Sequence, residues 1–219
     1  MEEPSSSDHL NSSLTDLMTS LMVIFILLLL VFVHRTAGKD AAVTDVLLKT
    51  LRHELIPQGF SEKTIRPDPR DRNAILVIVP EGLMNFETGK SALKPQGEQF
   101  LKIHIPELAE VLCSDKFRPS IESIVVEGHT DTQGWPGHRD EESQNLNLKL
   151  SQDRSMEVVK SALADLEGTE ANRACFLEKL SASGRGEQEQ EATPEESRRV
   201  ILKIRVKAAE VESIKAEVH

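Results

Sequence analysis

The longest apolar run of the chain extends from Leu17 to Val33 and contains no charged residue, proline or glycine. Extended back to Leu14, it would form a helix of about 30 Å at a rise of 1.5 Å per residue, the thickness of a bilayer core. No Lys or Arg precedes the run and no small-x-small cleavage site follows it, so a cleaved signal peptide fits poorly. We therefore predict a single transmembrane helix at residues 14–33, after a polar tail at residues 1–13.

The next segment, residues 34–71, has the pattern of a linker with one short amphipathic helix. Four leucines fall on one helical face between Thr44 and Leu55. Thr44 is the expected N-cap, and Pro57 and Gly59 are expected to end the helix. The following sequence, Arg66-Pro67-Asp68-Pro69, predicts a stiff extended spacer.

Residues 72–207 alternate between strand and helix patterns and form the predicted body. The expected strands are Ala74–Pro80, Ile121–Gly128, Phe176–Ser183 and Arg198–Lys207. The expected helices are Pro95–Cys113, which Pro106 must kink or split, and Ser151–Leu166, with Ser151 as N-cap. The order β-α-β-α-β-β predicts an α+β fold with helices on one face of a mixed sheet. Residues 208–219 read as a charged tail that frays.

Composition narrows the classes of function. The net charge is -10, no long basic run occurs, and the aromatic residues are seven Phe and one Trp with no Tyr. These values argue against nucleic acid as a partner. No nucleophile–base pair, phosphate loop or metal-ligand spacing is found in the sequence, so we expect neither an enzyme nor a cofactor nor a metal site.

The membrane segment carries one acid that needs explanation. Asp16 is the only formal charge between Asp8 and Arg35, and a carboxylate at the rim of a span marks a functional site by default. Two interpretations stay open: Asp16 or Thr15 caps the helix in the headgroup layer, or Asp16 carries an ion. Helical spacing places four polar residues on one face, namely Ser12, Asp16, Thr19 and Ser20.

Four short motifs follow one another in the body. They are Phe86-x-x-Gly-x-x-Ala-Leu, Glu127-Gly-His-Thr-Asp-x-x-Gly, Asn147-x-x-Leu-Ser-x-x-Arg and Arg198-Arg-Val. In this order they resemble the OmpA-like peptidoglycan-binding domain, and the resemblance covers about residues 72–207. It implies a groove in which Arg154 binds a carboxylate of the wall peptide and Asp131 accepts from its ammonium group.

The resemblance also assigns supporting residues. Asn147 orients the groove loop, His129 and Arg198 belong to the motifs, and backbone N–H groups near Ser151 offer a positive helix end. The alternative is that Asp131 and Arg154 form a structural salt bridge while His129 is a polar residue at a strand end. Equal sacculus binding by the body and its Arg154→Ala variant would contradict the groove.

The sequence departs from the family pattern at two places. Twelve residues separate Gly134 from Asn147, about twice the usual number, and this insertion can cover or reshape the groove. Ser197 stands where the family often has Asn. Cys113 and Cys175 form a disulfide if the body is periplasmic, worth roughly 4 kcal/mol, or else are two separate buried thiols.

The start of the membrane helix, Asp16-Leu-Met-Thr-x-x-Met, resembles that of MotB-type stator subunits. The resemblance implies that Asp16 carries protons and that Thr19 and Ser20 lie on the channel face. It implies a homodimer held by a multi-span partner of the MotA or ZorA kind, and a periplasmic body that binds peptidoglycan. This orientation conflicts with the positive-inside bias, because the basic residues follow the span: Arg35, Lys39, Lys49 and Arg52.

Two motor systems use this architecture, flagellar stators and the Zorya anti-phage complexes. The short N-terminus without a basic, aromatic lead-in, the compact spacer and the acidic insertion favour the Zorya type. A flagellar stator subunit is the first alternative. A passive envelope tether of the Pal kind, in which Asp16 is only a cap, is the second.

Overall fold

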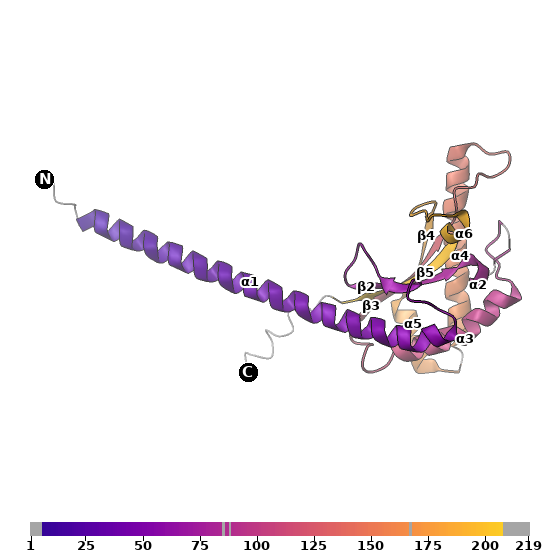
Figure 1. Ribbon diagram of the computed structural model, residues 1–219, viewed down its shortest axis with the longest axis horizontal. Helices are drawn as coiled ribbons and strands as arrows, with labels where there is room; N and C mark the ends of the chain where they lie inside the picture. Colours follow the sequence, from indigo (N-terminus) through magenta and orange to yellow (C-terminus); the bar gives the residue numbers. More distant parts are fainter. Residues whose placement is uncertain (1–5, 85, 88, 167, 208–219) are drawn as a thin grey trace. The chain divides into compact units, whose positions relative to one another are not determined.

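The computed structural model describes residues 6–84, 86–87, 89–166 and 168–207 (Figure 1). Internal contacts divide the chain into two compact units. The described part of the first is helical and runs to Asp40, and the second, here called the body, comprises Ala41–Lys207. The predicted tail at 208–219 and residues 1–5 lie outside the described residues.

Helix α1 extends from Ser6 to Leu55. Its segment Thr15–Val33 is long and apolar enough to cross a membrane, judged by length and composition. Residues 6–13, predicted as a tail, are helical. The predicted start of a separate helix at Thr44 is wrong, because α1 passes through this residue without interruption. The predicted end is confirmed: Pro57 lies in the 3₁₀ turn Ile56–Gln58, and Gly59 follows at φ 103°.

The predicted linker is largely part of the body. Leu47, Leu51 and Leu55 of α1 are almost fully buried and belong to the same hydrophobic core as Ile75 and Val77 of the sheet. Strand β1, Ile65–Pro67, pairs antiparallel with the next strand instead of forming a free spacer. Nε of Arg52 donates to the carbonyl oxygen of Ile65 at 3.0 Å. The body therefore begins at Ala41, about thirty residues before the predicted boundary of residue 72.

The body is built on one five-stranded sheet with strand order β1-β2-β5-β3-β4. The strands after β1 are β2 Ala74–Pro80, β3 Ile121–His129, β4 Leu180–Gly186 and β5 Arg199–Val206. β5 is antiparallel to both β2 and β3, whereas β3 and β4 are parallel. The α+β fold class with a mixed sheet is confirmed, and the predicted strand Phe176–Ser183 is shifted to Leu180–Gly186.

The described residues of the body form five α-helices after the end of α1: α2 Glu81–Met84, α3 Pro95–Leu112, α4 Asp140–Asp165, α5 Glu170–Lys179 and α6 Pro194–Ser197. α3 continues through Pro106. α4 starts well before the predicted Ser151, since the acids of its first turn suit a helix N-terminus and the backbone N–H of Arg139 donates to Glu142. The residues Phe176–Lys179, predicted as strand, end helix α5.

Ser151 is a packing residue within α4 and no N-cap. A Cβ on Gly128 of β3 would lie 2.2 Å from the carbonyl oxygen of Ser151, and one on Gly184 of β4 would lie 2.7 Å from the backbone nitrogen of Gln152. The backbone N–H of Gly186 donates to the Ser151 hydroxyl at 2.8 Å. Glycine at these strand positions lets α4 approach β3 and β4 closely. This close approach sets the position of Arg154, one helical turn after Ser151.

One face of the sheet packs against helices to form the core. The core residues of β2 and β5 alternate along each strand and include Ile75, Val77, Leu202 and Ile204. Cys113, just after α3, forms a disulfide with Cys175 of α5, with the Cα atoms 6.1 Å apart. This resolves the choice that the sequence left open in favour of the bridge.

Candidate ligand-binding groove

A groove of about 510 Å³ lies where β3 ends and β5 begins. Strand β5 lies between β2 and β3, and Arg199 at its start is opposite Pro80 on one side and His129 on the other. The residue before it, Arg198, therefore meets the groups that follow both neighbouring strands. The groove is lined by Glu81, Gly89, Thr130, Asp131, Gln133, Gly134, Trp135, Pro136, Asn147, Leu150, Arg154 and Arg198.

Two arginines and two acids form a charged cluster in this groove. Nη1 of Arg198 lies 2.5 Å from Oδ2 of Asp131, and Nε of Arg198 donates to Glu81. Nη2 of Arg154 lies 3.4 Å from Oε1 of Glu81. Glu81 thus bridges the two guanidinium groups. We refer to Glu81, Asp131, Arg154 and Arg198 as the charged half of the groove.

The structure brings the predicted residues Asp131, Arg154 and Arg198 together but changes their pairing. Among the described residues Asp131 pairs with Arg198, so the alternative of an Asp131–Arg154 salt bridge is not what is observed. Glu81 was missed by sequence reasoning. Its signal is its place directly after a buried strand, but its partner depends on the register of β2 with β5.

Arg154 is buried and has contacts with the segment that contains Phe86 and Lys90. Its Nε donates to the carbonyl oxygen of Lys90 at 3.1 Å, and its guanidinium lies 4.9 Å from the ring centroid of Phe86. Burial lowers the pKa of Arg154, and the carboxylate of Glu81 opposes this effect. The hydrogen bond with Asp131 raises the pKa of Arg198. Both guanidinium groups are therefore charged at all ordinary pH values.

The 6% exposure of the Arg154 side chain contrasts with 26% for Arg198. Arg198 is therefore the more accessible of the two guanidinium groups for a ligand carboxylate that enters the groove. Arg154 is less accessible and can contribute its remaining N–H donors. A planar guanidinium binds a carboxylate through two parallel hydrogen bonds. The carboxylates of Asp131 and Glu81 are suited to accept from a ligand ammonium group beside it.

Asn147 links the insertion to the groove. Its Oδ1 accepts from Nε1 of Trp135 at 2.7 Å, and its Nδ2 donates to the Gln133 carbonyl oxygen and to Glu187 at 3.2 and 2.8 Å. The contacts agree with the predicted role of Asn147 in orienting the loop. The insertion reaches the groove through Trp135 and Pro136, and its residues from Asp140 onward form the start of α4. Neither residue was identified as a lining residue from sequence.

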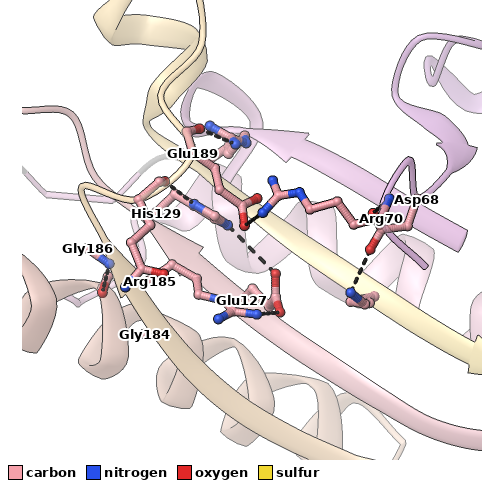
Figure 2. Close-up of polar contacts among 12 residues, drawn as sticks. Asp68, Arg70, Glu127, His129, Gly184, Arg185, Gly186 and Glu189 are labelled. Atoms are coloured by element: carbon pink, nitrogen blue, oxygen red, sulfur yellow. Dashed lines mark hydrogen bonds and ion pairs between the residues drawn. The ribbon is translucent and has the colours of Figure 1, made fainter. Parts of the chain in front are cut away.

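His129 lies outside the groove, contrary to its predicted place. It alternates with the core residues of β3 and points to the opposite face of the sheet, fully buried beside Glu127 (Figure 2). Its Nδ1 is 3.1 Å from the carbonyl oxygen of Gln188, and its Nε2 is 3.9 Å from Oε2 of Glu127, which is too long for a hydrogen bond. His129 therefore fits the interpretation of a structural residue at a strand end.

An ion network surrounds His129 on this outer face (Figure 2). Glu127 pairs with Arg185 at 2.7 Å, Glu189 with Arg70 at 2.5 Å, and Asp68 with Lys203 at 2.5 Å. Burial would raise the pKa of Glu127, but the neighbouring His129 and Arg185 hold it at about 2. The same kind of pairing lowers the pKa of Asp68 against the opposing effect of its burial.

Ser197, the second departure from the family pattern, is buried at the end of α6. Its hydroxyl donates to the carbonyl oxygen of Thr193 at 2.9 Å and accepts from the backbone N–H of Glu191 at 3.0 Å. It therefore fixes the loop that precedes Arg198, so a serine is sufficient at this position.

Comparison with known proteins agrees with this architecture. A family model described as the OmpA family matches residues 85–201, which is 117 of the 219 residues. The Zorya protein ZorB of Escherichia coli is 24% identical over 207 residues, covering 88% of this chain and 86% of that protein. The expected resemblance to the Zorya type is confirmed by this match.

A solved structure of similar fold supports the architecture. A putative MotB-like protein from Desulfovibrio vulgaris has a TM-score of 0.54 and 19% identity, covering 78% of this chain and 98% of that one. The periplasmic domain of Helicobacter pylori MotB has a TM-score of 0.49 and 15% identity, covering 69% and 94%.

Proposed function

This chain belongs to the OmpA family, and we propose that it is the peptidoglycan-anchored subunit of a proton-driven motor in the bacterial inner membrane. The observation that carries the proposal is the groove with its charged half. Two guanidinium groups and two carboxylates surround one cavity of ligand size. Such a set matches the amine and carboxylate of diaminopimelate in wall peptides.

The roles in the groove follow from exposure and contacts. Arg198 and Arg154 bind the ligand carboxylate, and Asp131 accepts from the ligand ammonium group. In the unliganded groove Asp131 is already paired with Arg198, so binding exchanges one ion pair for others without leaving a buried charge unpaired. Asn147 keeps the loop in place, as its three hydrogen bonds indicate.

Sedimentation with purified sacculi tests this part. We expect the full chain in detergent to bind, and Arg154→Ala to bind at least about tenfold more weakly, as for the loss of a charged hydrogen bond. Arg118→Ala is the matched control, since Arg118 is half exposed and its partner is Glu178 on α5. Equal binding by all three proteins would contradict the assignment of the groove as the peptidoglycan site.

The membrane helix supplies the second half of the proposal. Asp16 carries protons between the two sides of the membrane, and Thr19 and Ser20 line the same face toward a multi-span partner of the MotA or ZorA kind. Acids within spans are costly and mark ion pathways. The hydroxyl of Thr19 donates to the carbonyl oxygen of Asp16 at 2.9 Å. The helix therefore accommodates this polar side chain by an internal hydrogen bond.

The arrangement in the cell follows from these assignments. A body that holds the wall is periplasmic, so the N-terminus is cytoplasmic. Two copies form a homodimer within a ring of partner subunits. Similarity to a Zorya protein over most of the chain supports a role in anti-phage defence, ahead of a flagellar stator or a passive tether. The Cys113–Cys175 disulfide suits an oxidising compartment.

Asp16→Asn discriminates motor from tether, because the amide keeps its size but cannot ionise. We expect this variant to lose phage protection in cells while it still copurifies with its partner and sediments with sacculi. Asp45→Asn, an exposed acid on the same helix, is the control. Full phage protection by Asp16→Asn would contradict the motor and favour the passive envelope tether. Restored swimming in a stator-deleted strain, without phage protection, would favour the flagellar alternative.

A further inference from the structure

We propose that the second half of the groove binds a sugar ring of peptidoglycan, next to the peptide bound by the charged half. We call Thr130, Gln133, Trp135 and Asn147 the neutral half, since they carry no formal charge and line the same cavity. The inference rests on the proposed function and adds the glycan to the ligand. It gives the insertion between Gly134 and Asn147 a binding role.

Trp135 is fixed at both ends across the groove. Its Nε1 donates to Oδ1 of Asn147 on α4, and its six-membered ring lies 3.7 Å from the position that a Cβ on Gly89 would occupy. Its backbone N–H donates to the hydroxyl of Ser143. The indole therefore spans from α4 to the loop that supplies the Lys90 carbonyl to Arg154.

Such a fixed aromatic ring is suited to a flat, weakly polar ligand surface. Trp135 is half-buried, so part of its ring stays open to the cavity. A large ring whose position is already set loses little conformational freedom on binding. The C–H face of a pyranose has the size and polarity to stack on it.

The hydrogen-bonding groups around Trp135 fit sugar hydroxyl and acetamido groups. The hydroxyl of Thr130 is buried and has no hydrogen-bond partner among the described residues. A buried hydroxyl without a partner carries a free-energy cost, which a sugar group in the cavity would remove once the Thr130 side chain turned toward it. The exposed amide of Gln133 offers both a donor and an acceptor beside it.

The position of Asn147 is itself fixed by a charge outside the cavity. Its Nδ2 donates to Glu187 at 2.8 Å, which leaves Oδ1 oriented toward Trp135. The carboxylate of Glu187 thus supports the neutral half from outside the cavity, whereas the four residues of the neutral half have no carboxylate of their own. Because wall peptides are attached covalently to neutral N-acetylated sugars, adjoining charged and neutral halves can bind both parts of one ligand.

The chain offers a direct probe, since Trp135 is its only tryptophan and it has no tyrosine. We would titrate the full chain in detergent with a diaminopimelate tripeptide and with the same tripeptide attached to its disaccharide. The disaccharide–peptide is expected to change the tryptophan emission and to bind about tenfold more tightly than the bare peptide, in the range of an aromatic anchor.

Variants measured by calorimetry separate stacking from support of the loop. Trp135→Ala should lose the difference in affinity between the disaccharide–peptide and the bare peptide. Trp135→Phe should be intermediate, because it keeps a ring but loses the bond to Asn147. Thr130→Val should weaken only the disaccharide–peptide, about threefold, as for one neutral hydrogen bond. Thermal unfolding of each variant shows whether it is folded.

Each outcome bears on one proposal. Equal affinity for the two ligands, with no change in emission, would overturn the sugar assignment and leave the proposed function intact. Equal weakening of both ligands by Trp135→Ala would show that the ring only shapes the groove, which also overturns it. If neither ligand nor sacculi bind the wild-type chain, the proposed function itself fails.

Discussion

Two ion clusters of the body lie at opposite places on the same sheet: one on its outer face and one in the groove. They differ in how their acidic residues are paired. On the outer face, Asp68, Glu127 and Glu189 each have a basic partner within 2.7 Å, and these pairs join segments far apart in sequence. In the groove, Glu81 is shared between Arg154 and Arg198 beside an open cavity. The outer pairs also line a cavity, of about 420 Å³, so the clusters differ in how their acids are paired. One-to-one ion pairs stabilise a fold, whereas a shared carboxylate such as that of Glu81 can exchange partners with a ligand.

The largest effect is expected at the close approach of α4 to β3, which positions Arg154 in the groove. In Gly128→Ala the new Cβ would meet the carbonyl oxygen of Ser151, so α4 must move away from β3. We expect the free energy of unfolding to fall by about 3 kcal/mol, as for severe overpacking, and sacculus binding to be lost.

The control is Gly82→Ala, because a Cβ on Gly82 would meet nothing within 4 Å. Urea unfolding and sedimentation of both variants decide the matter. If Gly128→Ala bound sacculi like the wild type, the close approach of α4 would not be what positions Arg154.

Acid should weaken the outer face first. The pKa of Glu127 is about 2 in the folded body, below its ordinary value of 4.5. A lowered pKa means stabilisation that is present above about pH 4.5 and is lost as the pH falls toward 2. We expect the free energy of unfolding to drop by about 3 kcal/mol across this window, because the pKa difference of about 2.5 units corresponds to about 1.4 kcal/mol per unit.

Urea unfolding at several pH values between 6 and 2 measures this dependence. Glu127→Gln should show a flatter pH profile, with the residual slope due to Asp68, whose pKa is also lowered. An unchanged slope in Glu127→Gln would contradict the assignment.

A pair of methionine substitutions separates the two clusters. Lys203→Met leaves Asp68 without its cation and should cost about 1 kcal/mol of stability without affecting ligand affinity. Arg198→Met should lower the affinity for wall peptide about tenfold, the loss of a charged hydrogen bond. Calorimetric titration with the tripeptide and urea unfolding test both. A loss of affinity in Lys203→Met equal to that in Arg198→Met would remove the distinction between the clusters.

The smallest effect is expected at the exposed end of the outer face. The Arg70 side chain is 65% exposed where it pairs with Glu189, so solvent and salt screen the pair. Arg70→Gln should leave the unfolding midpoint within the error of the measurement at 0.15 M salt. A clear destabilisation there would mean that this pair, like that of Lys203, belongs to the buried network.

The sequence was most informative where a local pattern decides the structure. The strand Ala74–Pro80 was predicted with its observed ends, because a buried apolar run stops at Pro80. Asp131, Arg154 and Arg198 could be assigned to one groove because ordered motifs mark their positions.

What the sequence could not supply depends on contacts between distant segments. Glu81 enters the groove through the β2–β5 register, and His129 leaves it because strand alternation turns the side chain to the outer face. Trp135 lies in an insertion whose path no family pattern describes. The leucines before Leu55 have the same pattern whether they cover a linker helix or a core, so the start of the body was misplaced.

The bond from Arg52 to Ile65 has a consequence for crowding at the membrane. Strand β1 is one of the two edge strands of the sheet. Its outward carbonyl at Ile65 already accepts from the guanidinium of Arg52, and Pro67 has no N–H to offer. A neighbouring chain therefore finds few free backbone groups with which to add a strand. Two copies lying side by side would therefore be hindered from joining their sheets through the β1 edge.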